Sequence, residues 1–444
     1  MQLIKHIIFS DIGNGNKLMI NSLNGLIDKI DDAIYKTITR WSGLNEIVPA
    51  NEDEAILFND LQSRGYFVNN YKEEMEIKNK VLEKLRNKHS QIKTSNNITF
   101  VMTYDCNFRC SYCFEDKRNK NCTVGRTSKK TAVMTPELID SAFDLAGDSL
   151  NHIGLFGGEP LLPKTRAAFE YIISKAPDKY YYIISNGYYL EEFLDLLVKI
   201  KIFHITVTLD GDEKTHDSRR YLANGKPTYK KITSGITKCL ESNIPIRIRL
   251  NADSINFDEA NKQKENFLTM YSDYTDLLSF EIVPLIETKH DEKNDMFTRL
   301  YNIDKDFTPA EREKRNYQMT QAGPVLSYFT AGKNLQPVYS FCYAHESGYV
   351  VDPYGKIYPC LLPVGVEELA IGIYHPTVEF KENSIRNRSI ETIPECKECT
   401  YSLLCGGGCP VGLKDYTNIF KPACSSVRNQ IHNLLPALYN ASTK

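Results

Sequence analysis

The stretch "TYDCNFRCSYC", residues 103–113, places three cysteines within eight residues of one another. Cys106, Cys110 and Cys113 are spaced so that their sulfurs can reach adjacent corners of one metal cluster. A structural zinc site needs four ligands, and no His or Cys follows at the spacing of a fourth. Cys122 is only a loose candidate. The sequence therefore predicts a cluster held by three cysteines, with its fourth iron open to a small molecule.

The composition limits what kind of protein surrounds these cysteines. The chain has 444 residues, which is long enough for two or three domains. Its 54 Lys and Arg against 56 Asp and Glu give a net charge of -2, so no general basic field attracts nucleic acid or an acidic membrane surface. The sequence shows neither a signal peptide nor an apolar run of about 18 residues. We therefore expect a soluble cytoplasmic protein with neither a nucleic-acid partner nor a membrane segment.

The cysteine usage also favours metal binding over disulfides. Cytosolic thiols are kept reduced, so grouped cysteines in that compartment more often hold metal. Ten of the twelve cysteines fall into two sets, one in residues 106–113 and one in residues 342–424.

The residues before the first set predict a small α+β unit with a linker helix, residues 1–90. Strand-like runs "KHIIFS", "KLMINSL" and "NGLIDKI" are followed by helical runs at 31–41 and 53–68, the latter with Gly65 as a stop. The charged run from residue 71 to 93 predicts the linker helix.

Strand-like and helical runs then alternate over residues 97–290. The strand-like runs are "NITFVMTY", "HIGLFGG", "KYYYIISN", "FHITVTLDG", "PIRIRLNA" and "LSFEIVPL". Such alternation predicts an α/β fold with a parallel sheet or barrel. Ligands of that class bind at the carboxyl ends of the strands, and the first cysteine set directly follows one. Residues 291–340 predict a connecting segment, and residues 341–444 contain the second cysteine set and a closing helix.

Several motifs together resemble those of radical S-adenosylmethionine (SAM) enzymes. "CNFRCSYC" matches the CxxxCxxC signature, with the aromatic Tyr112 before the third cysteine. "GGEP" at Gly157 to Pro160, "SNG" at Ser185 to Gly187, and "TLDG" from Thr208, followed by "HDSRR", occur in the order typical of the family. The resemblance implies a partial (β/α)6 barrel.

The resemblance also implies how SAM would bind. Its methionine amine and carboxylate would chelate the open iron, and one electron from a flavodoxin- or ferredoxin-type donor would cleave SAM to a 5'-deoxyadenosyl radical. The cofactor contacts implied by motif position are Tyr112 at the adenine, Gly157, Gly158 and Glu159 at the methionine amine, Ser185, and Thr208 and Arg220 at the carboxylate or ribose. A guanidinium suits a carboxylate, but Arg220 could equally form a surface ion pair with Asp210 or Asp217. "GGEP" could also be a tight turn of any α/β protein.

The second cysteine set alone would suggest a zinc ribbon. Its whole pattern, CX12GX4C, CX2CX5CX3C and a last cysteine, resembles the SPASM extension of radical SAM enzymes, which carries two auxiliary [4Fe–4S] clusters. The protein would then hold three such clusters. The resemblance implies two ligand sets, Cys342, Cys360 and Cys409 for the first auxiliary cluster and Cys396, Cys399, Cys405 and Cys424 for the second.

The first auxiliary set is one ligand short. Sulfatase-maturing relatives add a cysteine shortly before the pattern, but "AGKNLQPVYSFC" has none. Either Cys122 or Cys239 completes the set, or a substrate thiolate does. Cys239 lies in a helical run typical of a core cysteine. We therefore expect an exchangeable iron.

The amino-terminal unit resembles a winged-helix-like element that binds leader sequences of ribosomally made peptides by strand addition. The alternative is a structural cap without a ligand. Together the resemblances imply a peptide maturase acting on a Cys-containing precursor peptide with a leader, forming intramolecular thioether cross-links as in sactipeptide and ranthipeptide synthases. The alternatives are carbon–carbon or ether cross-linking, epimerisation, anaerobic sulfatase maturation to formylglycine, and a non-catalytic iron–sulfur or zinc carrier.

Overall fold

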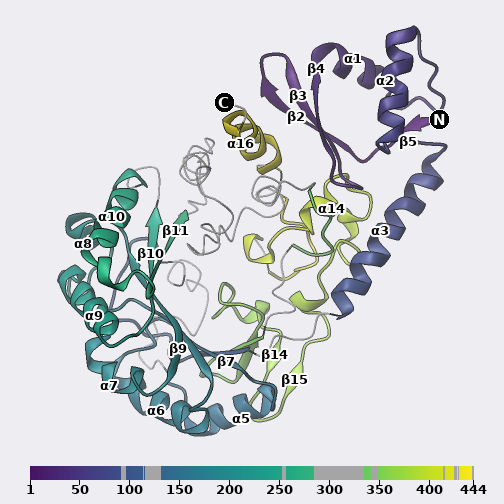
Figure 1. Cartoon of the computed structure of the whole chain (residues 1–444). Helices are drawn as coiled ribbons and strands as arrows, with labels where there is room; N and C mark the ends of the chain where they lie inside the picture. The colour runs from purple at the N-terminus through teal and green to yellow at the C-terminus, as the bar shows by residue number, and fades with distance from the viewer. Residues whose placement is uncertain are drawn as a thin grey trace.

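A computed structural model describes most of the chain (Figure 1). The described residues are 1–91, 97–113, 115, 132–252, 257–284, 335–341, 348–413, 416–424, 428 and 430–442. Cys122 and Cys342 lie outside these ranges, as does most of the predicted connecting segment. No helix in the described ranges is long and apolar enough to cross a membrane.

Six parallel strands form the centre of the main sheet. They are β6 (Asn97–Val101), β7 (His152–Phe156), β8 (Tyr180–Ser185), β9 (Lys201–Leu209), β10 (Ile246–Ala252) and β11 (Leu278–Pro284). Each pairs in parallel with the next strand along the chain. These strands coincide with the six strand-like runs of the sequence, so the predicted α/β fold is confirmed.

Helices cover the outer face of these strands, as Figure 1 shows. They are α5 (Pro136–Ala146), α6 (Arg166–Lys175), α7 (Leu194–Leu197), α8 (Glu213–Arg219), α9 (Tyr229–Glu241) and α10 (Phe257–Met270). Strand β10 illustrates the two faces: Ile246, Ile248 and Leu250 are buried in the largest hydrophobic cluster, while Arg247 and Arg249 alternate with them and are half-buried. The polar residues therefore lie on the inner, concave face of the sheet.

The same sheet continues into the carboxyl-terminal part of the chain. Strand β12 (Tyr349–Val351) pairs in parallel with β6, and β13 (Lys356–Tyr358), β14 (Gly372–Ile373) and β15 (Glu379–Phe380) follow antiparallel. Gly355, at φ +77°, makes the turn between β12 and β13. In the described part of the chain the sheet thus has ten strands, in the order β11-β10-β9-β8-β7-β6-β12-β13-β14-β15.

The remaining carboxyl-terminal elements are short. They are α14 (Ser402–Cys405), the π-helical turn η10 (Gln430–Leu434), α16 (Leu435–Ser442), and the 3-10 turns η6 (Glu367–Leu369), η7 (Ile385–Asn387), η8 (Pro394–Cys396) and η9 (Pro410–Gly412). Three further 3-10 turns, η2 (Pro163–Thr165), η3 (Glu191–Phe193) and η4 (Ser272–Tyr274), lie in the barrel.

The amino-terminal unit is α+β, as the sequence predicts. An antiparallel sheet of β2 (Ile7–Gly13), β3 (Asn16–Asn21) and β4 (Ile27–Asp31) precedes α1 (Asp32–Trp41), α2 (Glu52–Ser63) and the long α3 (Tyr71–Gln91), and β1 (Gln2–Leu3) pairs with β5 (Phe67–Val68). The helical run expected at 53–68, with Gly65 as its stop, ends as α2 at Ser63, and Phe67–Val68 form β5. Gly65 at φ +77° turns the chain after α2, so that β5 is a strand.

The amino-terminal unit packs directly on the carboxyl-terminal part, and α3 runs along it (Figure 1). Ile390, Ile393, Cys396 and Leu403 belong to the hydrophobic cluster of the amino-terminal unit. A second shared cluster joins strands β2 and β3 to Leu404, Cys405, Ile431 and Leu435.

Candidate functional site

The loop that follows β6 holds the first three cysteines. Cys106 is buried, and Cys110 and Cys113 are half-buried. The backbone N–H of Phe108 donates to Cys106 Sγ at 3.4 Å, and Asn186 Nδ2 lies 3.8 Å from the same sulfur. N–H groups directed at a cysteine sulfur stabilise its thiolate, the form that binds iron. The loop therefore suits an iron–sulfur cluster.

The Arg109 side chain and one backbone bond fix the shape of this loop. Arg109 Nη1 donates to the backbone oxygens of Cys106 at 2.8 Å and Phe108 at 2.7 Å. The backbone N–H of Cys113 donates to Cys110 O at 3.2 Å, which closes a tight turn between the two cysteines.

The "GGEP" turn after β7 is bonded to the cluster loop. The N–H of Gly158 donates to Thr103 O at 2.9 Å, and the N–H of Glu159 donates to Asp105 O at 2.8 Å. A Cβ on Gly157, at φ +137°, would lie 2.3 Å from Thr103 O, and one on Gly158 would lie 2.3 Å from Asp105 O. Only glycines allow the two loops to approach so closely.

Glu159 is fully buried and both of its oxygens are bonded. Its carboxylate accepts from Ser185 Oγ at 2.8 Å, the N–H of Asn186 at 2.7 Å and the N–H of Leu161 at 2.9 Å. Burial raises its pKa to about 6, although these three donors oppose the shift. The side chains of Glu159 and Ser185 thus bind each other. The contacts with SAM that the sequence implies for this segment would have to come from the backbone of Gly157 to Glu159.

Tyr112, expected at the adenine, belongs to a partly buried polar group. Its hydroxyl oxygen accepts from Arg220 Nη1 at 2.9 Å and from Asn251 Nδ2 at 3.1 Å. Burial raises the pKa of Tyr112, so its hydroxyl remains protonated. Asn251, at the carboxyl end of β10, is a member of this group that the sequence motifs did not indicate.

Among the contacts described for this part of the chain, Arg220 forms no surface ion pair with Asp210 or Asp217. Arg220 is only 7% exposed. The neighbouring Arg219 forms an ion pair with Asp210, with its Nε 3.1 Å from Asp210 Oδ2. Asp217 accepts from the backbone N–H groups of Thr228 and Tyr229 at 2.7 and 2.9 Å. Arg220 is therefore held inside the site by its bond to the Tyr112 hydroxyl.

Thr208 is buried near the carboxyl end of β9, paired in register with Arg249 of β10. Arg249 binds Glu281 of β11, with Nη2 2.9 Å from Oε2. The three residues form a row across the inner face of neighbouring strands.

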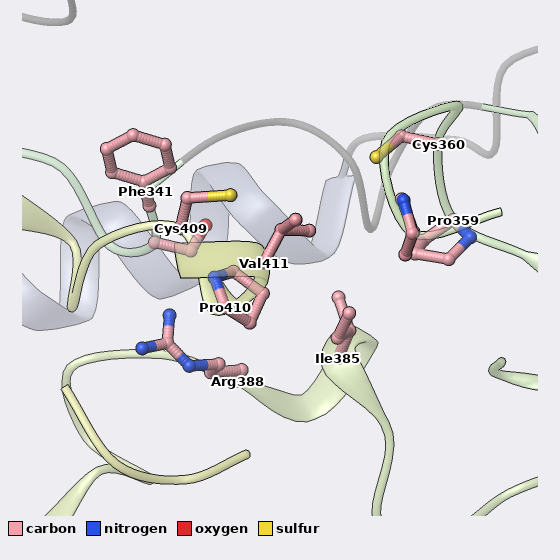
Figure 2. A pocket seen from close by; sticks show the side chains of 10 residues that line it. Phe341, Pro359, Cys360, Ile385, Arg388, Cys409, Pro410 and Val411 are labelled. Carbon is pink, nitrogen blue, oxygen red and sulfur yellow. The ribbon is translucent and has the colours of Figure 1, made fainter. Parts of the chain in front are cut away.

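Cys360 and Cys409 line one apolar pocket. Figure 2 shows their sulfurs pointing toward each other from opposite sides, with Val411 and Ile385 along the pocket. Phe341, the residue before Cys342, is also part of the lining. The sequence-predicted first auxiliary set is therefore brought together as far as the described residues extend.

The cysteines of the second auxiliary set influence one another electrostatically. Burial raises the pKa of Cys396 to about 12, and the charges that add to this shift are those of Cys405, Cys399 and Cys424. Burial likewise raises the pKa of Cys405 to about 11, with Cys424 and Cys399 contributing. The charges of these four cysteines therefore act on one another across residues 396–424, although in the described part of the chain they are not drawn together into a compact metal-ion site.

Arg388 holds the backbone of both auxiliary sets. Its guanidinium donates to Ile419 O at 2.8 Å, Gly407 O at 2.6 Å, Lys421 O at 2.8 Å and Gly408 O. Gly408 precedes Cys409, and Lys421 lies three residues before Cys424. The sequence did not single out Arg388, because its partners are backbone oxygens.

The two candidate extra ligands differ. Cys239 is fully buried in α9, and burial raises its pKa to about 12, so it behaves as a core residue. Cys122 lies outside the described residues.

Comparison with known proteins identifies the barrel. Residues 100–254 match the family described as the Radical SAM superfamily. A radical SAM cyclopropyl synthase of Paramaledivibacter caminithermalis is 22% identical over 94% of this chain and 92% of its own length. A cysteine-type anaerobic sulfatase-maturating enzyme of Clostridium novyi is 24% identical over 76% of this chain and 95% of its own.

Two solved structures share the fold. Native anSMEcpe with bound AdoMet matches at a TM-score of 0.55 and 20% identity, covering 78% of this chain and 99% of that one. Streptococcus suis SuiB bound to precursor peptide SuiA matches at 0.53 and 15% identity, covering 96% of this chain and 99% of that one. The second likeness extends over the amino-terminal unit as well as the barrel.

Proposed function

Because its barrel makes this chain a radical SAM enzyme, with SAM and a [4Fe–4S] cluster as cofactors, we propose that its substrate is a ribosomally made precursor peptide. A relationship to radical SAM peptide and protein maturases supports this, since SuiB is described with its precursor peptide and the Clostridium novyi relative as a sulfatase-maturating enzyme. The reaction that we favour is intramolecular thioether formation.

Cys106, Cys110 and Cys113 would hold the SAM-binding cluster. When bound, SAM and this cluster supply a radical that abstracts hydrogen from carbon. Arg220 and Asn251 hold the Tyr112 hydroxyl where the ring can border the adenine. Gly157 and Gly158 keep the "GGEP" backbone against the cluster loop, where its polar groups can meet the methionine amine.

The observation that carries the thioether proposal is the apolar pocket between Cys360 and Cys409. With Cys342 these cysteines would hold a first auxiliary cluster that lacks one ligand. Among the residues lining the pocket in the described ranges no third cysteine occurs, and Arg388 there is engaged by backbone oxygens. A substrate thiolate can therefore complete the set.

The overall reaction joins a substrate cysteine sulfur to a carbon of the same peptide. One C–H bond and one S–H bond break and one C–S bond forms. The hydrogen atom of the C–H bond leaves with the SAM-derived radical, the thiol gives up a proton, and one electron passes to the auxiliary clusters. The peptide thus loses two hydrogens for each cross-link, and a flavodoxin- or ferredoxin-type donor would supply the electron that starts each turnover.

The leader sequence would pair with strand β4. The other outer strand, β2, is covered by the carboxyl terminus, since Ser10 Oγ donates to Ile431 O at 2.7 Å and Asn440 Nδ2 donates to Ile12 O at 3.0 Å. Within the described ranges β4 pairs only with β3, so its second edge can accept a peptide strand.

The test is co-expression with a short Cys-containing precursor under anaerobic conditions. Intact and tandem mass spectra should show loss of two hydrogens per cross-link, at cysteines that no longer react with iodoacetamide. Cys360→Ala should abolish the cross-link while SAM is still cleaved reductively. A product with free thiols, or an aldehyde at the former cysteine, would contradict thioether formation and favour cross-linking elsewhere or formylglycine formation.

A further inference from the structure

Side chains of the amino-terminal unit hold the loop that contains Cys396 and Cys399. Lys78 Nζ donates to Lys397 O at 2.6 Å. Ser22 Oγ donates to Thr400 O, also at 2.6 Å. One of these carbonyls lies between the two cysteines and the other directly after them, so the loop is fixed from outside its own domain.

Lys78 is unlike the other lysines of α3. It is 2% exposed, whereas Lys72, Lys80 and Lys84 on the same helix are exposed. Burial of a lysine is unfavourable unless opposite charge or acceptors surround it. Burial lowers the pKa of Lys78, and the charges that oppose this shift are, in order, those of Cys399, Glu74, Glu398 and Cys396. Through its bond to the carbonyl of Lys397, which lies between Cys396 and Cys399, the Lys78 ammonium group is placed at the loop that carries these two cysteines.

A buried pair one turn earlier on α3, Glu74 and His6, ties this helix to the amino-terminal strands. Glu74, one turn before Lys78, is fully buried. Its Oε1 accepts from the N–H groups of Lys5 at 2.8 Å and His6 at 3.1 Å, and His6 Nδ1 lies 2.6 Å from it. The entrance to strand β2 is therefore connected through α3 to the cysteine loop.

We propose that Lys78 is a positioning residue of the second auxiliary cluster, which brings a positive charge from the amino-terminal unit to the cluster and raises its reduction potential. The unit is then part of a redox site in addition to any role in peptide recognition. This inference rests on the proposed ligation of that cluster by Cys396, Cys399, Cys405 and Cys424.

The expected effect follows from electrostatics. Reduction adds one negative charge to the cluster, and a fixed positive charge nearby in a medium of low dielectric constant favours the reduced form. Lys78→Met removes the charge and keeps most of the side-chain volume. At a fixed solution potential the ratio of reduced to oxidised cluster should fall about tenfold, which corresponds to about 59 mV for a one-electron couple.

The experiment is an anaerobic redox titration of the reconstituted full-length protein, followed by electron paramagnetic resonance. Lys78→Met should shift one auxiliary signal to lower potential, and Lys78→Arg should restore it, since Arg keeps the charge. Lys80→Met, an exposed lysine two residues away, is the matched control and should leave all potentials unchanged. Ser22→Ala removes the hydrogen bond to Thr400 O but no charge. It should therefore change the shape of the auxiliary signal more than its potential.

The iron content and the potentials of these variants distinguish an error about the cluster from an error about Lys78. If Cys396→Ala leaves about twelve irons per chain and all signals intact, the proposed cluster does not exist. If that variant loses about four irons but Lys78→Met and Lys78→Arg keep the wild-type potential, the role of Lys78 is wrong. Loss of that cluster in Lys78→Met with full recovery in Lys78→Arg would support positioning by charge, whereas loss in both would contradict it.

Discussion

Tyr104 donates its hydroxyl hydrogen to Asp352 Oδ2 at 2.8 Å, and both side chains are buried. Tyr104 lies two residues before Cys106, and Asp352 begins the β12–β13 turn that leads to Cys360. Asp352 Oδ1 accepts from the N–H groups of Tyr354 at 3.0 Å and Lys356 at 2.9 Å. One hydrogen bond therefore connects the loop of the first cysteine set with the hairpin that carries a cysteine of the second.

Tyr104→Phe should lower the free energy of unfolding by about 1–3 kcal/mol, since it leaves a buried carboxylate oxygen without its donor. Urea unfolding under anaerobic conditions measures the change. Tyr354→Phe, at a partly exposed ring on the same turn, is the control and should change stability by less than about 0.5 kcal/mol. Equal effects of the two substitutions would mean that the bond to Asp352 is not important.

Gly158→Ala tests the close approach of the "GGEP" turn to the cluster loop. A Cβ 2.3 Å from Asp105 O forces the backbones apart, so we expect destabilisation by about 1–3 kcal/mol and loss of SAM cleavage. Gly147→Ala, at φ +68° with no atom within 4 Å of its Cβ, isolates backbone strain and should retain SAM cleavage. Full activity of Gly158→Ala would contradict the interpretation.

The raised pKa of Glu159 predicts a pH dependence of stability. Its folded-state pKa of about 6 exceeds the ordinary 4.5, so the folded protein binds more protons between these values. Its contribution to stability is thus full below about pH 4.5 and is lost as the pH rises through 6, by about 2 kcal/mol in total. Unfolding free energies of the SAM-free protein at pH 5 to 7.5 measure this slope. Glu159→Gln should flatten it, and an unchanged slope would assign it to other groups.

Arg388→Lys should reduce the iron content at both auxiliary sets. Lysine cannot reproduce the fork that binds four backbone oxygens, and the buried acceptors would lose their donors. We expect destabilisation by about 2–4 kcal/mol and a loss of up to about eight irons per chain, with SAM cleavage retained. Arg86→Lys, which alters an exposed pair with Glu391, is the control and should cost less than about 1 kcal/mol. Normal iron content in Arg388→Lys would remove it from the cluster sites.

The sequence predicts the elements better than it predicts their contacts. Strand-like runs between helical runs located β6 to β11, and fixed cysteine spacing located both cysteine sets, because these signals are local in the chain. Gly65 was predicted as the stop of α2 and does end it, but the two-residue strand β5 after it was not predicted, since the hydrophobic residues continue past Gly65.

Contacts between distant residues carry no such local pattern. Arg219 and Arg220 are adjacent in sequence. Only the folded structure shows that Arg219 pairs with Asp210 and that Arg220 binds Tyr112. In the sequence Lys78 is one of several lysines on a charged helix. Its burial and its bond to Lys397 O depend on how α3 packs against the carboxyl-terminal part. The leader-binding and cluster-ligating roles remain predictions.

The pairing of β12 with β6 has a consequence for biogenesis. Strand β6 receives its second neighbour only when residues 349–351 have left the ribosome, late in synthesis. Until then the edge of β6, and the cysteine loop directly after it, stay uncovered on that side. The bond from Tyr104 to Asp352, and with it the final support of the segment that leads to Cys106, can therefore form only after most of the chain has been synthesised.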